Sequence, residues 1–260
     1  MTAMGLMHSL TTWLAVRLLF FPTRTIELYP GQWDLNFEEV MFGSADKIAL
    51  HAWFMPGGSP NRTLIYYHGN AGNIGDRLPK LKRLHQIGMN IFIFDYRGYG
   101  GSEGQPSLEG VVEDSLAAYR YVLSRGDIDP NHIILYGESL GGALALQVAM
   151  QEKISGLILE STFTSLMDMK QASYPFVPNR MVPDMYRSID LIRNVHEPIL
   201  ILHGTKDRTI PFRMGEQLFQ AAPPPKRFLP IEGADHSDIY DMEPEQTLQQ
   251  IEEFLAEIGE

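Results

Sequence analysis

Short apolar runs alternate with amphipathic segments along most of the chain. Runs rich in β-branched and aromatic residues predict strands at residues 39–42, 48–55, 63–67, 90–96, 132–136, 157–159, 198–202 and 227–229. Apolar positions spaced by three and four predict helices at residues 76–86, 108–123, 140–150, 212–221 and 244–258. Strands that alternate with helices need crossover connections, so the pattern predicts an α/β fold with a mostly parallel sheet and helices on both faces. Ligands bind such sheets beyond the carboxyl ends of the strands, so the chemistry is expected in the loops that follow them.

The chain opens with a mostly apolar segment. Residues 3–21 approach the length of about 20 residues that a membrane-spanning helix needs, but polar side chains such as Arg17 interrupt them. We therefore expect residues 1–24 to form an N-terminal apolar helix, a candidate for association with a membrane surface, and residues 25–260 to form the folded domain. The alternative is a helix packed on that domain. If the segment spans a membrane, Arg17 and Arg24 put the domain on the cytoplasmic side. The expected location is therefore cytoplasmic, or membrane-associated facing the cytoplasm.

Composition excludes several classes of function. The 260 residues carry a net charge of −11, whereas a protein that binds the phosphate backbone needs a basic face, so nucleic acid is not an expected partner. The chain has no cysteine, which excludes thiolate nucleophiles and zinc–cysteine sites. It has no Walker loop or zincin pair either, and no metal site is predicted.

A candidate nucleophile lies between a predicted strand and a predicted helix. Residues 137–141 read Gly-Glu-Ser-Leu-Gly, which is the G-x-S-x-G pattern of a nucleophile elbow in the strand–turn–helix setting that the elbow requires. Such a turn strains the backbone of the serine, and the flanking glycines avoid side-chain collisions there. Ser139 is therefore the predicted nucleophile. The alternative is a serine that only caps an ordinary helix.

A serine hydroxyl needs a base, and the base needs an orienting carboxylate. Asp207 and His236 each lie in a loop that directly follows one of the predicted strands. The order of serine, acid and histidine is the one expected for an elbow in this topology, so Asp207 is the predicted acid and His236 the predicted base. Glu160, at the end of another strand, is an alternative acid. Asp235 adjoins His236 in sequence and is therefore a poor candidate to orient it.

The loop at residues 68–73 (His-Gly-Asn-Ala-Gly-Asn) follows the strand at 63–67. Acyl transfer develops negative charge on the former carbonyl oxygen, and two backbone N–H groups should face it. One is expected from Leu140, the residue after the nucleophile. The other is expected from Asn70, with Ala71 as the second choice.

The same loop has a competing interpretation. Gly69, Gly72 and Gly75, with Asp95 further along the chain, suggest a dinucleotide-binding loop whose acidic residue holds the ribose. The spacing is G-x-x-G-x-x-G rather than G-x-G-x-x-G, however. A dinucleotide site would also leave the elbow and its two predicted partners unexplained.

Three blocks of sequence, residues 67–73, 95–104 and 137–142, resemble the α/β-hydrolase superfamily. Together they look most like the small bud-emergence hydrolases and the membrane-associated α/β-hydrolase-domain thioesterases, and serine aminopeptidase-like hydrolases are similar. The resemblance implies an eight-stranded sheet, a Ser139–Asp207–His236 triad and no cofactor. It also implies that Asp95 and Arg97 tie the loop beneath the site.

Lids in this fold are inserted after the strand that follows the elbow helix. Residues 164–195 occupy that place, and their length suits a small cap of short helices. We expect Met167, Tyr174, Phe176 and Met181 to form an apolar substrate-binding wall, because methionine and aromatic side chains adapt to acyl groups. Ordinary packing of the insertion on the sheet is the alternative.

These residues predict a serine hydrolase that cleaves small carboxylic esters, with short to medium acyl chains, through an acyl-enzyme on Ser139. Alternative activities are an acyl-protein thioesterase and a serine peptidase. A noncatalytic binding scaffold is the alternative of another class, and an intact triad argues against it.

Overall fold

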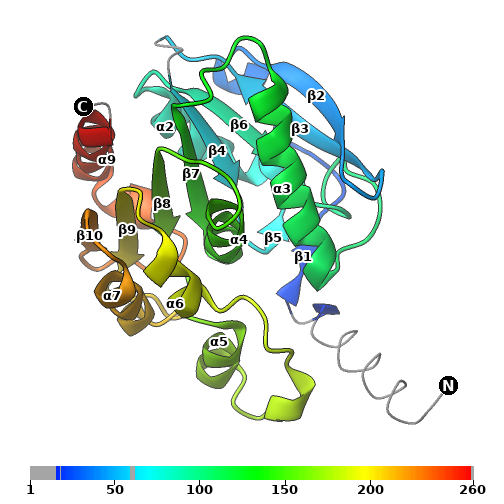
Figure 1. Cartoon of the computed structure of the whole chain (residues 1–260). Coiled ribbons are helices and arrows are strands. Elements are labelled where there is room, and N and C mark those ends of the chain that lie inside the picture. The colour runs from blue at the N-terminus through cyan, green and yellow to red at the C-terminus, as the bar shows by residue number, and fades with distance from the viewer. Residues whose placement is uncertain (1–15, 18, 59–61, 259–260) are drawn as a thin grey trace, which may run out of the picture.

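The computed structural model describes residues 16–17, 19–58 and 62–258, which form a central sheet with helices on both faces (Figure 1). The strands are β1 (Phe21–Pro22), β2 (Glu38–Gly43), β3 (Ala49–Met55), β4 (Thr63–Tyr67), β5 (Ala71–Gly72), β6 (Asn90–Phe94), β7 (Ile133–Glu138), β8 (Gly156–Glu160), β9 (Ile199–Gly204) and β10 (Lys226–Ile231). The α-helices are α2 (Leu78–His85), α3 (Leu108–Ser124), α4 (Leu140–Ala149), α5 (Leu166–Ser173), α6 (Ser188–Leu191), α7 (Phe212–Ala221), α8 (Ile239–Met242) and α9 (Pro244–Ile258). Short 3-10 helices are η1 (Pro30–Trp33), η2 (Ile74–Arg77), η3 (Asn179–Met181) and η4 (Ile192–Asn194). The predicted α/β architecture is confirmed.

The main sheet has eight strands in the order β10-β9-β8-β7-β4-β6-β3-β2. Neighbouring strands from β10 to β6 are parallel, and β3 runs antiparallel to both of its neighbours. The mostly parallel, eight-stranded sheet implied by the resemblance is therefore confirmed.

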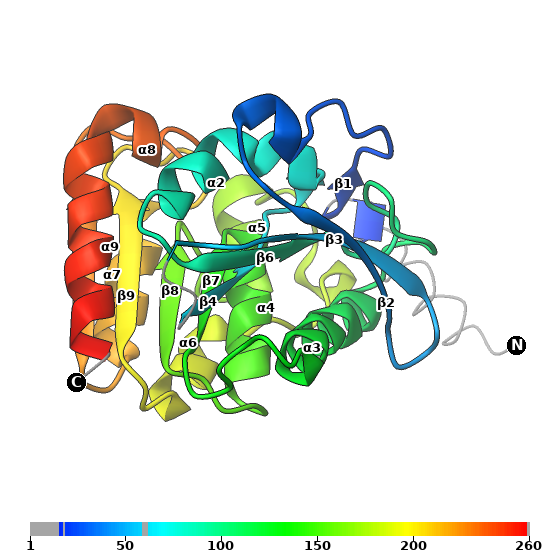
Figure 2. The same ribbon diagram turned by 90° about the horizontal axis from the view of Figure 1, so that it is seen from above.

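Apolar side chains cover both faces of the sheet. One cluster packs α3, α4 and α7 on one face, and a second packs α2, α8 and α9 on the other. Figure 2 shows α2 and α3 on opposite sides of the sheet. Helix α4 is apolar nearly all round and is buried along most of its length, as expected for a helix with no polar face.

The strand register brings the predicted loops together. Tyr67 of β4 pairs with Gly137 of β7, so the loop at 68–73 and the elbow leave the sheet at the same level. Ile231 of β10 pairs with Gly204 of β9, which aligns the loops that carry the predicted acid and base in the same way. All four loops follow the carboxyl ends of parallel strands, where sites form in this class of fold.

Most of the predicted N-terminal segment lies outside the described residues, which begin at Val16. Val16, Arg17 and Leu19 are helical, and Phe21–Pro22 form β1, which pairs in parallel with β5. The structure thus places a strand at the end of the segment for which a helix was expected. In the described part of the chain, no helix is long and apolar enough to cross a membrane.

Other element boundaries also differ from the sequence-based expectations. The strand predicted at 90–96 ends at Phe94, and the buried carboxylate of the next residue, Asp95, accepts the N–H of Ile74, 3.1 Å away. The helix predicted at 76–86 begins as η2, and α2 follows from Leu78. Residues 164–195 contain α5, η3, α6 and η4.

Candidate active site

Ser139 lies at the sharp turn between β7 and α4. Its backbone is in a strained conformation, with φ 54° and ψ −114°, as expected at a nucleophile elbow. A Cβ atom at Gly141 would overlap the carbonyl oxygen of Tyr67, so glycine lets the start of α4 approach the end of β4. The Ser139 side chain makes no helix-capping hydrogen bond, which argues against the capping interpretation.

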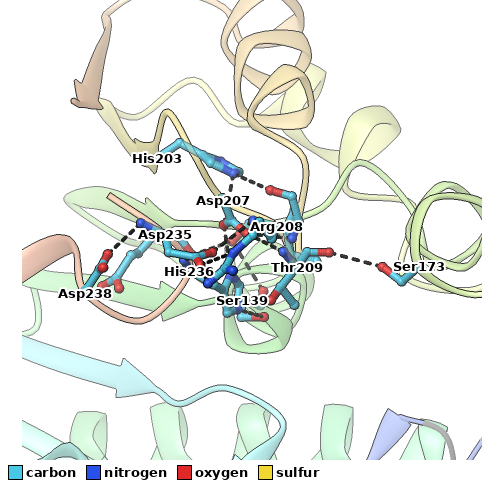
Figure 3. A network of polar contacts seen from close by, with 12 residues as sticks. Ser139, Ser173, His203, Asp207, Arg208, Thr209, Asp235, His236 and Asp238 are labelled. Atoms are coloured by element: carbon cyan, nitrogen blue, oxygen red, sulfur yellow. Dashed lines mark hydrogen bonds and ion pairs between the residues drawn. The ribbon is translucent and has the colours of Figure 1, made fainter. Parts of the chain in front are cut away.

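The structure brings Ser139, His236 and Asp207 together (Figure 3). The Oγ atom of Ser139 lies 3.2 Å from Nε2 of His236. The Nδ1 atom of the same ring lies 2.8 Å from Oδ2 of Asp207. A proton on Nδ1 is donated to the carboxylate, which leaves Nε2 free to accept the proton of the serine hydroxyl.

Burial and hydrogen bonding shift the pKa values of Asp207 and His236 in opposite directions. Burial raises the pKa of Asp207, but hydrogen bonds from His203 and His236 outweigh it and hold that pKa below its usual value. Burial lowers the pKa of His236, but the hydrogen bond and negative charge of Asp207 prevail and raise that pKa above 6.5. The carboxylate therefore stays ionised, and its negative charge favours the protonated form of the imidazole.

Further contacts fix the Asp207 carboxylate. Its Oδ1 atom accepts the N–H groups of Thr209 and Ile210, at 2.8 and 2.7 Å. His203 lies on the other side, with Nε2 3.4 Å from Oδ2 and 2.9 Å from the carbonyl oxygen of Ile210. The Ser173 hydroxyl donates to the carbonyl oxygen of Thr209 at 3.1 Å, which joins α5 to this loop. His203 lies four positions before Asp207, but no sequence motif there indicates that it contacts the acid.

The loop at 68–73, which we call the oxyanion loop, lies beside the elbow through the pairing of β4 with β7. Leu140 is the first residue of α4, and the N–H of a first helical residue has no partner within its helix. In the oxyanion loop, the carbonyl oxygen of Asn70 accepts the N–H of Phe21 at 2.9 Å and the hydroxyl of Tyr99 at 2.7 Å. The backbone of the predicted donor residue is thus firmly held.

A buried polar cluster lies directly behind the nucleophile. Lys80 Nζ donates to Glu160 at 2.6 Å and lies 3.4 Å from Glu138. Tyr66 donates to Glu138 at 2.5 Å, and Tyr136 donates to Glu160. The charges of Glu138 and Glu160 add to the rise in the pKa of His236. Among these residues, sequence reasoning weighed only Glu160.

The structure separates the candidate acids. Glu160 bonds to Lys80 and Tyr136, whereas the carboxylate that contacts the His236 ring is that of Asp207. Asp235 instead pairs with Arg208. This arrangement favours Asp207 over Glu160 and Asp235 as the acid that orients His236.

The dinucleotide interpretation also finds no support in these contacts. The carboxylate of Asp95 is buried, accepts the N–H of Ile74 and lies 3.4 Å from Nδ1 of His51, so it is not free to hold a ribose. The described residues contain no cluster of three or more side chains arranged to hold a metal ion.

Only two of the four residues predicted to form the substrate-binding wall share a cavity. Tyr174 and Met181 line a small apolar cavity of about 30 Å³ that is bounded by Leu19 and by α5. Met167 does not line it, and the side chain of Phe176 is 80% exposed. The structure therefore does not bring the four residues together in one cavity.

Comparison with known proteins agrees with this geometry. Residues 58–187 match the family described as serine aminopeptidase, S33. The uncharacterized protein Rv2307c of Mycobacterium tuberculosis is 37% identical over 250 residues, which cover 93% of this chain and 87% of that protein. The α/β-hydrolase domain-containing protein WAV2 of Arabidopsis thaliana is 34% identical, over 73% of this chain and 68% of its own.

A solved structure shares the fold. The Pyrococcus furiosus esterase Pf2001 superposes with a TM-score of 0.77 at 18% identity and covers 91% of this chain and 98% of its own. At this identity the likeness concerns the fold alone. The family match and the relatives show that the chain belongs to the α/β-hydrolase superfamily, in the family described as serine aminopeptidase, S33.

Proposed function

We propose that this protein is a serine hydrolase that cleaves carboxylic esters through an acyl-enzyme on Ser139. The observation that carries the proposal is the continuous chain of contacts from Ser139 Oγ through the His236 ring to Asp207, at 3.2 and 2.8 Å. This chain lies at the carboxyl edge of the sheet, next to two loops suited to hold an oxyanion. A residue is therefore available for each role in nucleophilic acyl transfer: nucleophile, general base, orienting acid and oxyanion donor.

The first half of the reaction forms the acyl-enzyme. His236 accepts the Ser139 proton on Nε2 while Oγ attacks the acyl carbon, and the negative charge moves to the former carbonyl oxygen. The N–H groups of Asn70 and Leu140 stabilise that charge. Asp207 stabilises the imidazolium, which then gives its proton to the departing alcohol as the bond to the leaving oxygen breaks.

The second half releases the acid. His236 accepts a proton from water, and the resulting hydroxide attacks the acyl carbon of the ester on Ser139. The tetrahedral intermediate collapses, Oγ takes the proton back from His236, and the free acid leaves. No cofactor is needed for either half.

Short to medium acyl groups are the proposed substrates, with Tyr174 and Met181 forming part of the acyl-binding wall. The apolar character of the cavity that they line supports their place in this wall. The description of the matched family favours a serine peptidase as the second candidate. Rates on esters, the matching thioesters and aminoacyl p-nitroanilides would separate the esterase, thioesterase and peptidase activities.

A fluorophosphonate probe tests the mechanism without choosing a substrate. Intact mass spectrometry should show one adduct per chain on the wild type, and peptide mapping should place it on Ser139. A short-chain ester present in excess should slow the labelling. Labelling of Ser139→Ala to the same extent would contradict the proposal, and the exposed Ser124→Ala variant should label like the wild type.

A further inference from the structure

The segment at residues 19–25, which we call the strap, lies along the oxyanion loop. The N–H of Phe21 donates to the carbonyl oxygen of Asn70 at 2.9 Å, and the N–H of Thr23 donates to that of Gly72 at 3.0 Å. These bonds form the parallel pairing of β1 with β5 (Figure 1). Main-chain pairing thus connects the N-terminal part of the described chain to the loop expected to stabilise the transition state.

Side chains of the oxyanion loop strengthen this connection. The Asn70 amide donates to the carbonyl oxygen of Leu19 at 3.0 Å. The buried Asn73 amide donates to the carbonyl oxygens of Thr23 and Thr25, at 3.2 and 2.8 Å. Its Oδ1 atom accepts the N–H of Gly75 at 2.9 Å. Asn73 therefore holds the strap with one end of its amide and the start of η2 with the other.

The opposite side of the strap is fixed to the loop at residues 95–104. The N–H of Gly100 donates to the carbonyl oxygen of Thr23 at 3.0 Å. The Arg24 guanidinium donates to the carbonyl oxygens of Ser102 and Gly104, the latter at 2.8 Å. The strap is thus held between two loops at the carboxyl edge of the sheet.

Such support matters because the oxyanion loop contains two glycines, and Gly72 has a φ of +78°. Glycine gives a loop many alternative conformations, whereas oxyanion stabilisation depends on N–H groups that are already oriented before the charge develops. A peptide unit is planar, so turning the Asn70 carbonyl toward the strap also turns the N–H of Ala71 away from it. The hydrogen bonds from the strap therefore fix the orientation of the peptide group between Asn70 and Ala71.

We propose that the strap is a positioning element for catalysis, with the Asn73 side chain holding it to the oxyanion loop and the Arg24 side chain holding it to the loop at residues 95–104. The proposal rests on the acyl transfer proposed for Ser139. Neither side chain is expected to touch the substrate. Both act through the orientation of the backbone N–H groups in the oxyanion loop.

Asn73→Asp is the sharpest test. It keeps the oxygen that accepts from Gly75 and replaces the donor to the strap with a second acceptor oxygen, which repels the carbonyl oxygens of Thr23 and Thr25. We expect kcat per titrated active site to fall by about 10- to 100-fold with KM little changed, a loss short of that for removing an oxyanion donor. The inhibition constant of a trifluoromethyl ketone should rise by the factor by which kcat/KM falls.

Arg24 gives an independent test of the same element. Arg24→Ala should lower kcat in the same way, and Arg24→Lys should recover part of the loss because an ammonium can still donate to one of the two carbonyls. Asn194→Asp is the matched control, since Asn194 is exposed and donates only to the carbonyl oxygen of Asp190 among its described side-chain contacts. It should behave like the wild type.

Hydrogen exchange supplies a readout that does not depend on activity. In Asn73→Asp, amides of residues 68–75 should exchange faster while the midpoint of global unfolding changes little. If exchange there and kcat per titrated site both match the wild type, the strap has no positioning role. A lower titrated active fraction at unchanged kcat also overturns the proposal, since it shows only a structural effect. Failure of the proposed function appears separately, as full activity in Ser139→Ala.

Discussion

Asp207 Oδ2 lies 2.8 Å from Nδ1 of His236, while its other oxygen is held by two backbone N–H groups. The carboxylate is thus fixed from one side by the fold and faces the imidazole with the other. It can fix the ring orientation, select the tautomer with a proton on Nδ1 and stabilise the imidazolium.

The activity of the wild type should depend on the protonation of His236. The imidazole must be neutral to accept the serine proton, and the contact with Asp207 raises its pKa above 6.5. We therefore expect kcat/KM to fall as the pH is lowered through this raised pKa and to level off above it. A profile of kcat/KM against pH on a p-nitrophenyl ester measures this. An acid limb well below 6.5 would contradict the assignment of His236 as the base.

Asp207→Asn should abolish most of the activity. The amide cannot stabilise an imidazolium and favours the wrong tautomer, so we expect kcat to fall by about 10⁴-fold. Any residual acid limb should move to lower pH, because the negative charge that raised the pKa of His236 is gone. Asp235→Asn, the same change at the residue next to His236, should retain nearly full activity. Equal losses in the two variants would show that Asp207 has no special role.

Arg97 should be more important for stability than an exposed arginine. It donates to Asp114 with its backbone and its guanidinium and also to Asp46, and Asp114 is fully buried. Arg97→Ala would leave that carboxylate without its charged partner, so we expect the free energy of unfolding to fall by about 3–5 kcal/mol. Urea unfolding followed by circular dichroism measures the loss.

Arg187→Ala is the matched control for this change. Arg187 forms exposed ion pairs with Asp184 and Asp190, and pairs of this kind contribute about 0–1 kcal/mol. If the two alanine variants unfold at the same urea concentration, the network around Arg97 does not stabilise the fold as described.

Met181→Ala should change the preference for acyl-chain length. Met181 lines the small apolar cavity bounded by Leu19 and Tyr174, and its truncation makes room for further methylene groups. We expect the ratio of kcat/KM for a longer ester to that for a shorter one to rise by about tenfold or more. Met41→Ala, at an exposed position on β2, should leave the ratio unchanged. An unchanged ratio in Met181→Ala would remove this cavity from the acyl site.

The fold and the residues of the site followed from local patterns. The elbow is contained in five consecutive residues between a strand and a helix, and the order of the chain then limited the candidates for acid and base. The contacts that hold the site could not be found in this way. Asn73 and Thr25 are 48 positions apart and carry no shared motif, so their contact depends on how the strap folds back along the sheet edge.

Local sequence patterns also could not predict the end of a strand or helix where a tertiary contact determines it. Asp95 directly follows an apolar run in sequence, but its carboxylate accepts the N–H of Ile74 and the strand ends before it. The predicted wall of the cap failed to form one cavity for a related reason. The composition of residues 164–195 showed which side chains are apolar, but it did not show that Phe176 would be left exposed.

The most direct test of the central claim is the initial rate of hydrolysis of p-nitrophenyl esters of increasing chain length by the wild type and by Ser139→Ala. The account predicts turnover by the wild type and a loss of about three decades or more in the variant, since only binding and the oxyanion loop would remain to accelerate the reaction. Equal rates in the two proteins, or a wild type inert on every ester, would contradict it.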